Sequence, residues 1–378
     1  MRRHYLDNIR WMTVAVVVIY HVFYMYNAEG VQGVVGKITN MDVQYQDLLQ
    51  YIIYPWIMIL LFIVSGISSR LYLEKHTAKE FVRSRTAKCL VPVTIGLFAF
   101  QFIQGYVNAG ISEAFVKTTA EMQGNVPGPV IVIVCGIICI ASGIGVLWYI
   151  QMLWLFSLVL LLIRLIDKDR LWKVCAKTPV WLVVLLAVPV FGAAQIGNTP
   201  LIVSYRFGLY FFVFLLGYFV FSHEEVIERM KKWFFIFLIP AIGLGVAFCI
   251  KYFGENYADN PAYRSVLFLG YGYFASMAIL ATMARFGDFS NKFTQWMSKR
   301  SFGLYVFHYL GISAVGLYLA KPGLIPPLVA YLLSAVAGFG GAYLLYEIIS
   351  RIPVYRWMVL GMSKKKEPKN PEKKTIEG

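Results

Sequence analysis

Apolar runs long enough to cross a membrane recur along almost the whole chain, and short charged segments separate them. This pattern is typical of a membrane protein that crosses the bilayer many times. It predicts an all-α fold, a polytopic bundle of transmembrane helices. About ten spans fit the pattern best: 11–27, 48–69, 87–107, 147–166, 180–196, 203–221, 233–253, 265–285, 301–320 and 327–349.

The stretch 130–163 is ambiguous, because it fits either two spans or one span preceded by a re-entrant or interfacial segment at 130–145. Charge distinguishes the two arrangements. With one crossing, most of the 35 Lys and Arg residues fall on one side of the membrane. A second crossing would move the basic loop 164–177 outside and invert every later loop. The positive-inside rule therefore favours one crossing there, ten spans in total and both termini in the cytoplasm.

Composition agrees with a protein of the cell (inner or plasma) membrane whose main partner is the lipid bilayer. The 378 residues are 59% hydrophobic, with a mean hydropathy of +0.63. The first apolar run lacks a small-residue cleavage site, so it reads as a retained helix. We expect one transmembrane domain at 1–360, followed by a basic, disordered cytoplasmic tail at 361–378.

Two site classes receive no support from composition. The net charge of +15 would suit a nucleic-acid partner, but the basic residues lie in loops between spans, so no nucleic acid is expected. The five cysteines have no metal-ligand spacing, and no metal site is predicted. Phosphate-binding loops and HExxH motifs are also missing, which leaves ATP-driven pumping and zinc hydrolysis unsupported.

Arg10 and His21 mark the two ends of the first apolar run, RWMTVAVVVIYH. An eleven-residue step returns a helix to within about 20° of the same face and advances it by about 16 Å. The pair therefore predicts a cation near one membrane surface and a titratable imidazole deeper in the bilayer, on one helix face. Asp7 lies one turn before Arg10 and is placed for an i,i+3 pair. The simpler alternatives are a membrane-anchoring Arg10 and a His21 bonded within the bundle.

Other polar residues interrupt later spans, and each needs a partner or water inside the bundle. They are His308, Arg206 and Glu347. Arg206 could snorkel outward, and Glu347 could pair with Arg10 or Arg351. The loop before the third span carries Arg83, Arg85 and Lys88, a cationic cluster that suits a polyanion such as a nucleotide phosphate, or that is ordinary loop charge.

These features together resemble the acyltransferase-3 family of integral membrane acyltransferases, which includes bacterial O-acetyltransferases of polysaccharides and glucans. The resemblance covers about residues 5–360. LDNIRWMTVAVVVIYH is similar to the family's opening helix, LLFIVSGI to its second-helix motif ending in Ser65, and FVRSRTAKCLVP to the basic start of its third helix. LWYIQMLW, FFVFLLGY and SFGLYVFH resemble later landmarks, and YEIISRIPVYRWMVLG resembles the last helix.

The resemblance implies an enzyme that moves an acyl group, acetyl in most members, from cytoplasmic acyl-CoA to a hydroxyl of a carbohydrate or glycolipid acceptor at the extracytoplasmic face. It implies no permanently bound cofactor. His21 would be the general base or the acyl carrier, with Arg10 and Asp7 holding the donor or the helix. The residues expected to bind acyl-CoA are Arg83, Arg85, Lys88 and Ser65. The residues expected to line the tunnel are Trp148, His308, Arg206 and Glu347.

Some family members carry a C-terminal extracytoplasmic hydrolase-like domain, and this chain ends after its last span with the basic tail. We therefore expect it to act alone or with a separate extracytoplasmic partner. The alternative function is a multi-pass transporter or flippase of a lipid-linked or small substrate, since such carriers also bury Arg, Glu and His. The acceptor, the acyl chain and the oligomeric state stay open.

Overall fold

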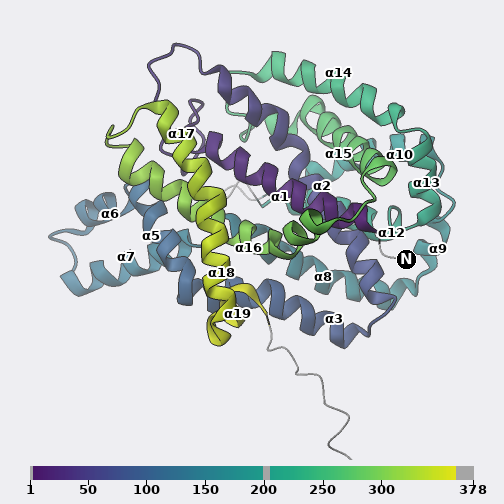
Figure 1. The fold of residues 1–378 in the computed structure, drawn as a ribbon, viewed down its shortest axis with the longest axis horizontal. Coiled ribbons are helices and arrows are strands. Elements are labelled where there is room, and N and C mark those ends of the chain that lie inside the picture. Colours follow the sequence, from purple (N-terminus) through teal and green to yellow (C-terminus); the bar gives the residue numbers. More distant parts are fainter. Residues whose placement is uncertain (1–2, 199–204, 363–378) are drawn as a thin grey trace, which may run out of the picture.

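The computed structural model describes residues 3–198 and 205–362, which fold into a bundle of helices with no β-strand in those ranges (Figure 1). The all-α, membrane-spanning fold is thereby confirmed. Within the described residues, eight helical segments are long and apolar enough to cross a membrane. They are α1 (His4–Tyr24), Tyr45–Leu73 with α2 (Leu48–Leu73), Ala78–Ile111, Gly145–Asp167 with α8 (Trp148–Asp167), α14 (Phe235–Tyr252), α15 (Val266–Phe286), Lys292–Ala320 with α16 (Lys292–Val315), and Pro327–Arg351.

Two of the predicted spans are shorter than the others. The span expected at 180–196 is a short apolar helix, Val180–Ala194, and the one expected at 203–221 becomes α12 (Phe207–Phe219). α12 bends by 101° into α13 (Glu224–Lys232), so this bent pair counts as a ninth span only if its two helices are taken together. α13 carries charge at both ends, which accounts for its departure from the membrane direction.

The ambiguous stretch divides into two helices. α7 (Gly128–Ser142) ends at Gly143, before α8, and lies against α5 (Phe102–Ile111). A Cβ atom at Gly105 would lie 1.6 Å from the carbonyl oxygen of Cys139, so only glycine permits this contact. In Figure 1, α6 (Ala114–Met122) and α7 form a projection at the left of the bundle. Arg70 near the end of α2 pairs with Asp169 at 2.7 Å, so α8 ends beside the end of α2, as one crossing requires.

One end of the bundle gathers many of the arginines, and we call it the basic end. It contains the start of α1, where Arg3 pairs with Glu224 at 2.8 Å, and the end of α2. Gly361, after α19 (Pro353–Leu360), packs against the backbone of Ala87. The first and last described helices thus have their chain ends at this end. That the basic end faces the cytoplasm stays a prediction, and residues 363–378 of the expected tail lie outside the described residues.

α2 lies at the centre of the bundle and contacts α1, α12 and α15. The contact with α12 depends on two glycines. A Cβ atom at Gly66 would lie 2.0 Å from the carbonyl oxygen of Phe214, and one at Gly217 would lie 2.1 Å from that of Ile63. Small residues at such crossings let helix backbones approach closely within a membrane. α1 packs between α2 and α16, so its polar face is directed into the bundle.

The remaining helices connect the spans or extend them. Their bounds are α3 (Ala78–Arg85), α4 (Val91–Val93), α9 (Arg170–Cys175), α10 (Val180–Leu185), α11 (Ala187–Ala194), α17 (Pro327–Val336) and α18 (Ala342–Arg351).

Candidate functional site

Two histidines meet in the interior of the bundle. His21 on α1 and His308 on α16 approach with Nδ1 of the first 3.1 Å from Nε2 of the second, and their ring centroids are 5.0 Å apart. His308 is fully buried, whereas His21 is half-buried. The sequence indicates that both residues lie deep in their spans, but it does not indicate that they touch.

The second ring nitrogen of His21 is open. Nδ1 contacts Val17 and His308, while Nε2 forms no hydrogen bond with the described residues. Nε2 is also not one of the enclosed side-chain atoms that lack a partner in the described part of the chain. A molecule can therefore approach this nitrogen, as a general base or a nucleophile requires.

Tyrosine rings surround the imidazole of His21. The ring centroids of Tyr20 and Tyr309 lie 5.1 Å from it, and that of Tyr24 lies 5.7 Å away. The hydroxyl groups of Tyr20 and Tyr24 bond elsewhere, to Tyr257 and to the backbone of Gln32. Sequence reasoning missed these residues, although Tyr20 and Tyr24 are close to His21 in the sequence. They form an aromatic wall that limits where a substrate can enter.

Arg10 lies nearer the basic end on the same helix. Its guanidinium pairs with Asp7 at 3.0 Å, which confirms the expected i,i+3 pair, and also donates a hydrogen bond to Ser68 on α2. The Asp7 carboxylate therefore already balances the charge of Arg10. The pair fixes the start of α1 against α2.

The three residues of the predicted cationic cluster do not share one face. Arg85 is half-buried and donates to the hydroxyl of Ser69 on α2 at 2.7 Å. Arg83 and Lys88 are exposed. Two residues along a helix turn the side-chain direction by about 200°, so Arg83 and Arg85 point to opposite sides. Arg85 is the member of the cluster that faces the bundle interior.

Neighbouring side chains connect the Arg85 region to the histidine pair. Ser65, one turn before Ser69, bonds through its hydroxyl to that of Tyr149 at 2.6 Å. The Tyr149 ring lies 6.0 Å from that of Tyr305, which in turn lies 6.4 Å from the ring of His308. Sequence reasoning missed Tyr149 and Tyr305. The only signal for them was their position inside the motifs LWYIQMLW and SFGLYVFH.

Trp148 precedes Tyr149 and packs against other aromatic residues, with its ring 5.6 Å from that of Tyr210 and 6.3 Å from that of Tyr205. Arg206 is 2% exposed, so the expectation that it snorkels outward is wrong. Its guanidinium bonds to Tyr54 at 2.9 Å and lies over the ring of Tyr263. Aromatic faces compensate a buried guanidinium and explain how it stays inside.

Glu347 has arginine partners near the basic end. Its carboxylate pairs with Arg300 at 2.8 Å and, more weakly, with Arg351 at 3.4 Å. The expected partner Arg351 is thus confirmed, whereas Arg10 pairs with Asp7 instead. Because two arginines balance Glu347, its role is to hold α16 against α18.

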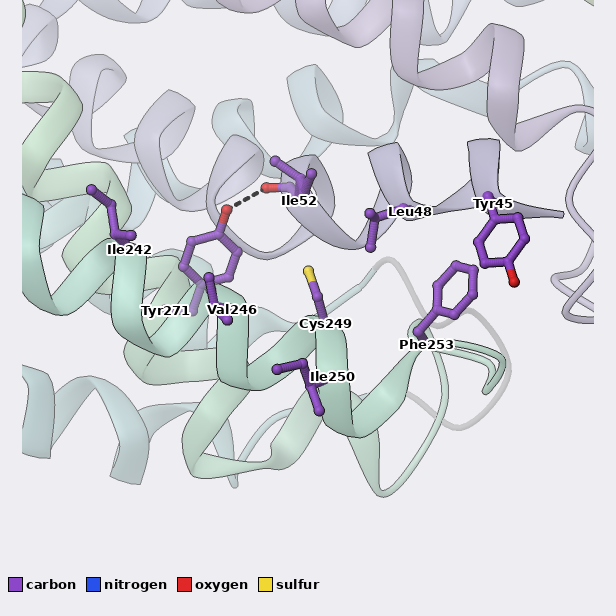
Figure 2. Close-up of a pocket in the computed structure, with 10 residues that line it drawn as sticks. Tyr45, Leu48, Ile52, Ile242, Val246, Cys249, Ile250, Phe253 and Tyr271 are labelled. Carbon is purple, nitrogen blue, oxygen red and sulfur yellow. Dashed lines mark hydrogen bonds between the residues drawn. The ribbon is translucent and has the colours of Figure 1, made fainter. Parts of the chain in front are cut away.

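Neither a metal centre nor the groove of Figure 2 competes with the histidine pair as the site of chemistry. No group of three or more His, Cys, Asp or Glu residues in the described ranges could hold a metal ion. An apolar groove of about 610 Å³ lies between α2 and α14, where Tyr271 donates a hydrogen bond to the backbone of Ile52 (Figure 2). Its lining lacks a carboxylate, an imidazole and a cation, so it offers no acid–base pair.

Comparison with known proteins identifies the family. A family model described as an acyltransferase domain, that of the acyltransferase-3 family, matches residues 3–347. This range includes Arg10, His21, Arg85 and His308. No curated protein and no solved structure gives a significant match to the chain. Because the family match covers nearly the whole bundle, the chain belongs to the acyltransferase-3 family and is a multi-pass membrane acyltransferase.

Proposed function

We propose that the protein transfers an acyl group, acetyl in the first instance, from acyl-CoA at the basic end to a hydroxyl of a carbohydrate or glycolipid acceptor at the opposite face of the cell membrane. The observation that carries this proposal is the open Nε2 of His21 in the bundle interior. Side chains in series extend from there to Arg85 at the basic end.

The donor would bind at the basic end through its phosphates. Arg85 has no carboxylate partner in the described ranges, so its charge is available to an anion. Arg83 and Lys88 are exposed nearby on the same segment and would meet the more distant phosphates. Arg10 and His21 are separated by about 16 Å along α1. The extended pantetheine arm is about as long as half of the ~30 Å hydrocarbon core, which lets the thioester reach His21.

Two chemical routes use the same nitrogen. As a general base, His21 Nε2 takes the acceptor's hydroxyl proton while the oxygen bonds to the thioester carbonyl carbon, the C–S bond breaks and the CoA thiolate leaves. As an acyl carrier, Nε2 attacks the carbonyl carbon first and CoA leaves. The acceptor hydroxyl then displaces the imidazole and loses its proton. Either route delivers the acyl group directly or to a separate extracytoplasmic partner.

The test combines donor binding with transfer. Purified protein in detergent is titrated with acetyl-CoA by calorimetry, and inverted vesicles from an expressing strain are given acetyl-CoA with a labelled acetyl group. We expect saturable binding and labelled carbohydrate or glycolipid. His21→Ala should reduce transfer by about 10²- to 10⁴-fold, because it removes the general base or carrier. The variant should still bind acetyl-CoA.

His76→Ala is the matched control, because His76 is exposed in the loop before α3 and bonds only to the backbone of Tyr72. It should transfer at the wild-type rate. Transfer at the wild-type rate by folded His21→Ala protein would contradict the role of His21. Folded wild-type protein that binds neither acetyl-CoA nor succinyl-CoA would contradict the donor and favour the transporter alternative.

A further inference from the structure

We propose that His308 is a positioning residue, which holds His21 in the tautomer that is protonated on Nδ1 and leaves Nε2 as the reacting atom. This inference rests on the proposed function for its catalytic meaning. The tautomer itself is a property of the resting protein. It can be measured whether or not the acceptor is known.

The contacts of His308 determine its own protonation. Its Nδ1 lies 3.1 Å from the carbonyl oxygen of Leu304 and 2.9 Å from that of Tyr305. Carbonyl oxygens only accept hydrogen bonds, so Nδ1 must carry the proton. In the neutral imidazole the other nitrogen, Nε2, then has a lone pair and acts as an acceptor.

The same argument then determines the state of His21. Its Nδ1 lies 2.9 Å from the carbonyl oxygen of Val17 and 3.1 Å from Nε2 of His308. Both neighbours are acceptors, so Nδ1 of His21 carries the proton and donates to them. One carbonyl alone would give a single contact along the helix, whereas His308 reaches across from α16 and fixes the ring at a second point. The lone pair of His21 is therefore on Nε2, the open nitrogen.

The pair also prepares His21 for a positive charge. When Nε2 takes a proton, the imidazolium keeps donating from Nδ1 to two acceptors that do not have to move. No carboxylate forms an ion pair with His21 in the described ranges, so a second imidazole and a backbone carbonyl provide the orientation that a carboxylate supplies in other histidine sites. Full burial of His308 holds it in place.

Nitrogen NMR tests the tautomer directly. The full chain is labelled with ¹⁵N-histidine in lipid nanodiscs at neutral pH, and the signals of His21 and His308 are assigned by loss in His21→Ala and His308→Leu protein. Protonated and unprotonated ring nitrogens give well-separated ¹⁵N shifts. We expect His21 to be protonated on Nδ1 and not on Nε2. A His21 protonated on Nε2 in the resting protein would overturn the proposal.

Two substitutions separate positioning from packing. His308→Gln places an amide oxygen where it can accept from His21, whereas His308→Leu fills similar space without an acceptor. We expect His308→Leu to lower the maximal transfer rate by about 10- to 100-fold, as loss of an orienting partner does. Acetyl-CoA affinity should be unchanged, and a mixture of His21 tautomers should appear. His308→Gln should restore the Nδ1-protonated signal and most of the rate.

The two proposals fail in different ways. Equal rates and equal His21 signals in the Leu and Gln variants would overturn the positioning role, while acetyl-CoA-dependent transfer by the wild type would still support the function. Absence of acetyl-CoA binding would overturn the function, while the NMR signals would still report the tautomer.

Discussion

Arg70 and Arg85 lie at the same end of the bundle, and their surroundings differ. Arg70 is 7% exposed, pairs with Asp169 at 2.7 Å and with Glu74 at 3.1 Å, and lies 3.7 Å from the ring centroid of Trp172. Arg85 is half-buried and has a serine hydroxyl and the ring of Phe81 as its neighbours. Two carboxylates balance the first charge, and none in the described ranges balances the second.

The difference separates a structural arginine from a candidate binding arginine. The Arg70 cluster is closed, because Trp172 also stacks on His223 at 4.2 Å and donates to the hydroxyl of Ser222. A guanidinium with no carboxylate can gain most from an anionic ligand. Basic character alone therefore does not identify the donor site. The partners of each arginine do.

The largest expected effect is on stability, from Arg70→Ala. The change leaves Asp169 and Glu74 without their partner and removes the stacking on Trp172. We expect the free energy of unfolding to fall by about 3 kcal/mol, at the low end for a buried pair because both carboxylates reach solvent. Thermal unfolding in detergent measures this. Arg351→Ala is the control, because that side chain is 79% exposed and should leave the melting temperature unchanged.

The next effect is on donor binding, from Arg85→Ala. Loss of a charge-assisted contact to a phosphate should weaken acetyl-CoA binding by about 30-fold, or about 2 kcal/mol. The melting temperature should stay close to that of the wild type, because only a hydroxyl partner is lost. Calorimetry measures the affinity. Arg83→Ala, on the opposite side of the helix, should change it by about threefold or less. A larger loss in Arg83→Ala would place the donor on the outer side of α3.

The smallest effect is a pH dependence from His223, in the turn between α12 and α13. Burial lowers the pKa of His223 below its usual value of about 6.5, against a smaller opposing effect of its bond to Trp172. The neutral form is favoured in the folded protein, so stability should be complete above about pH 6.5 and fall as the pH drops toward the lowered pKa. His223→Phe keeps the stacking and should flatten the melting temperature between pH 5.5 and 7.5, about the range in which histidine titrates. An unchanged slope would assign it to other groups.

Local relations along one helix could be read from the sequence. The Asp7–Arg10 pair and the shared face of Arg10 and His21 follow from helical periodicity, which fixes the direction of side chains three, four or eleven residues apart. The helical spans follow from apolar length, because hydrocarbon forces the backbone to satisfy its own hydrogen bonds. The all-α fold and the family motifs were predictable for these reasons.

The pairing of distant residues was not predictable in this way. His21 and His308 are 287 residues apart, and Glu347 found Arg300 instead of Arg10. The short helix Val180–Ala194 and the bend after α12 also departed from the regular spans. Such features depend on how each helix is rotated against its neighbours, and close contacts such as Gly66 on Phe214 set that rotation.

The sequence by itself determined that the chain is a membrane-spanning helical acyltransferase and which residues of α1 share a face, because hydrophobic length and helical period act along the chain. The tertiary structure decided that Arg85 faces inward, that Arg70 is neutralised and that His308 orients His21. Those facts depend on which side chains meet across helix interfaces, and packing in three dimensions sets those meetings.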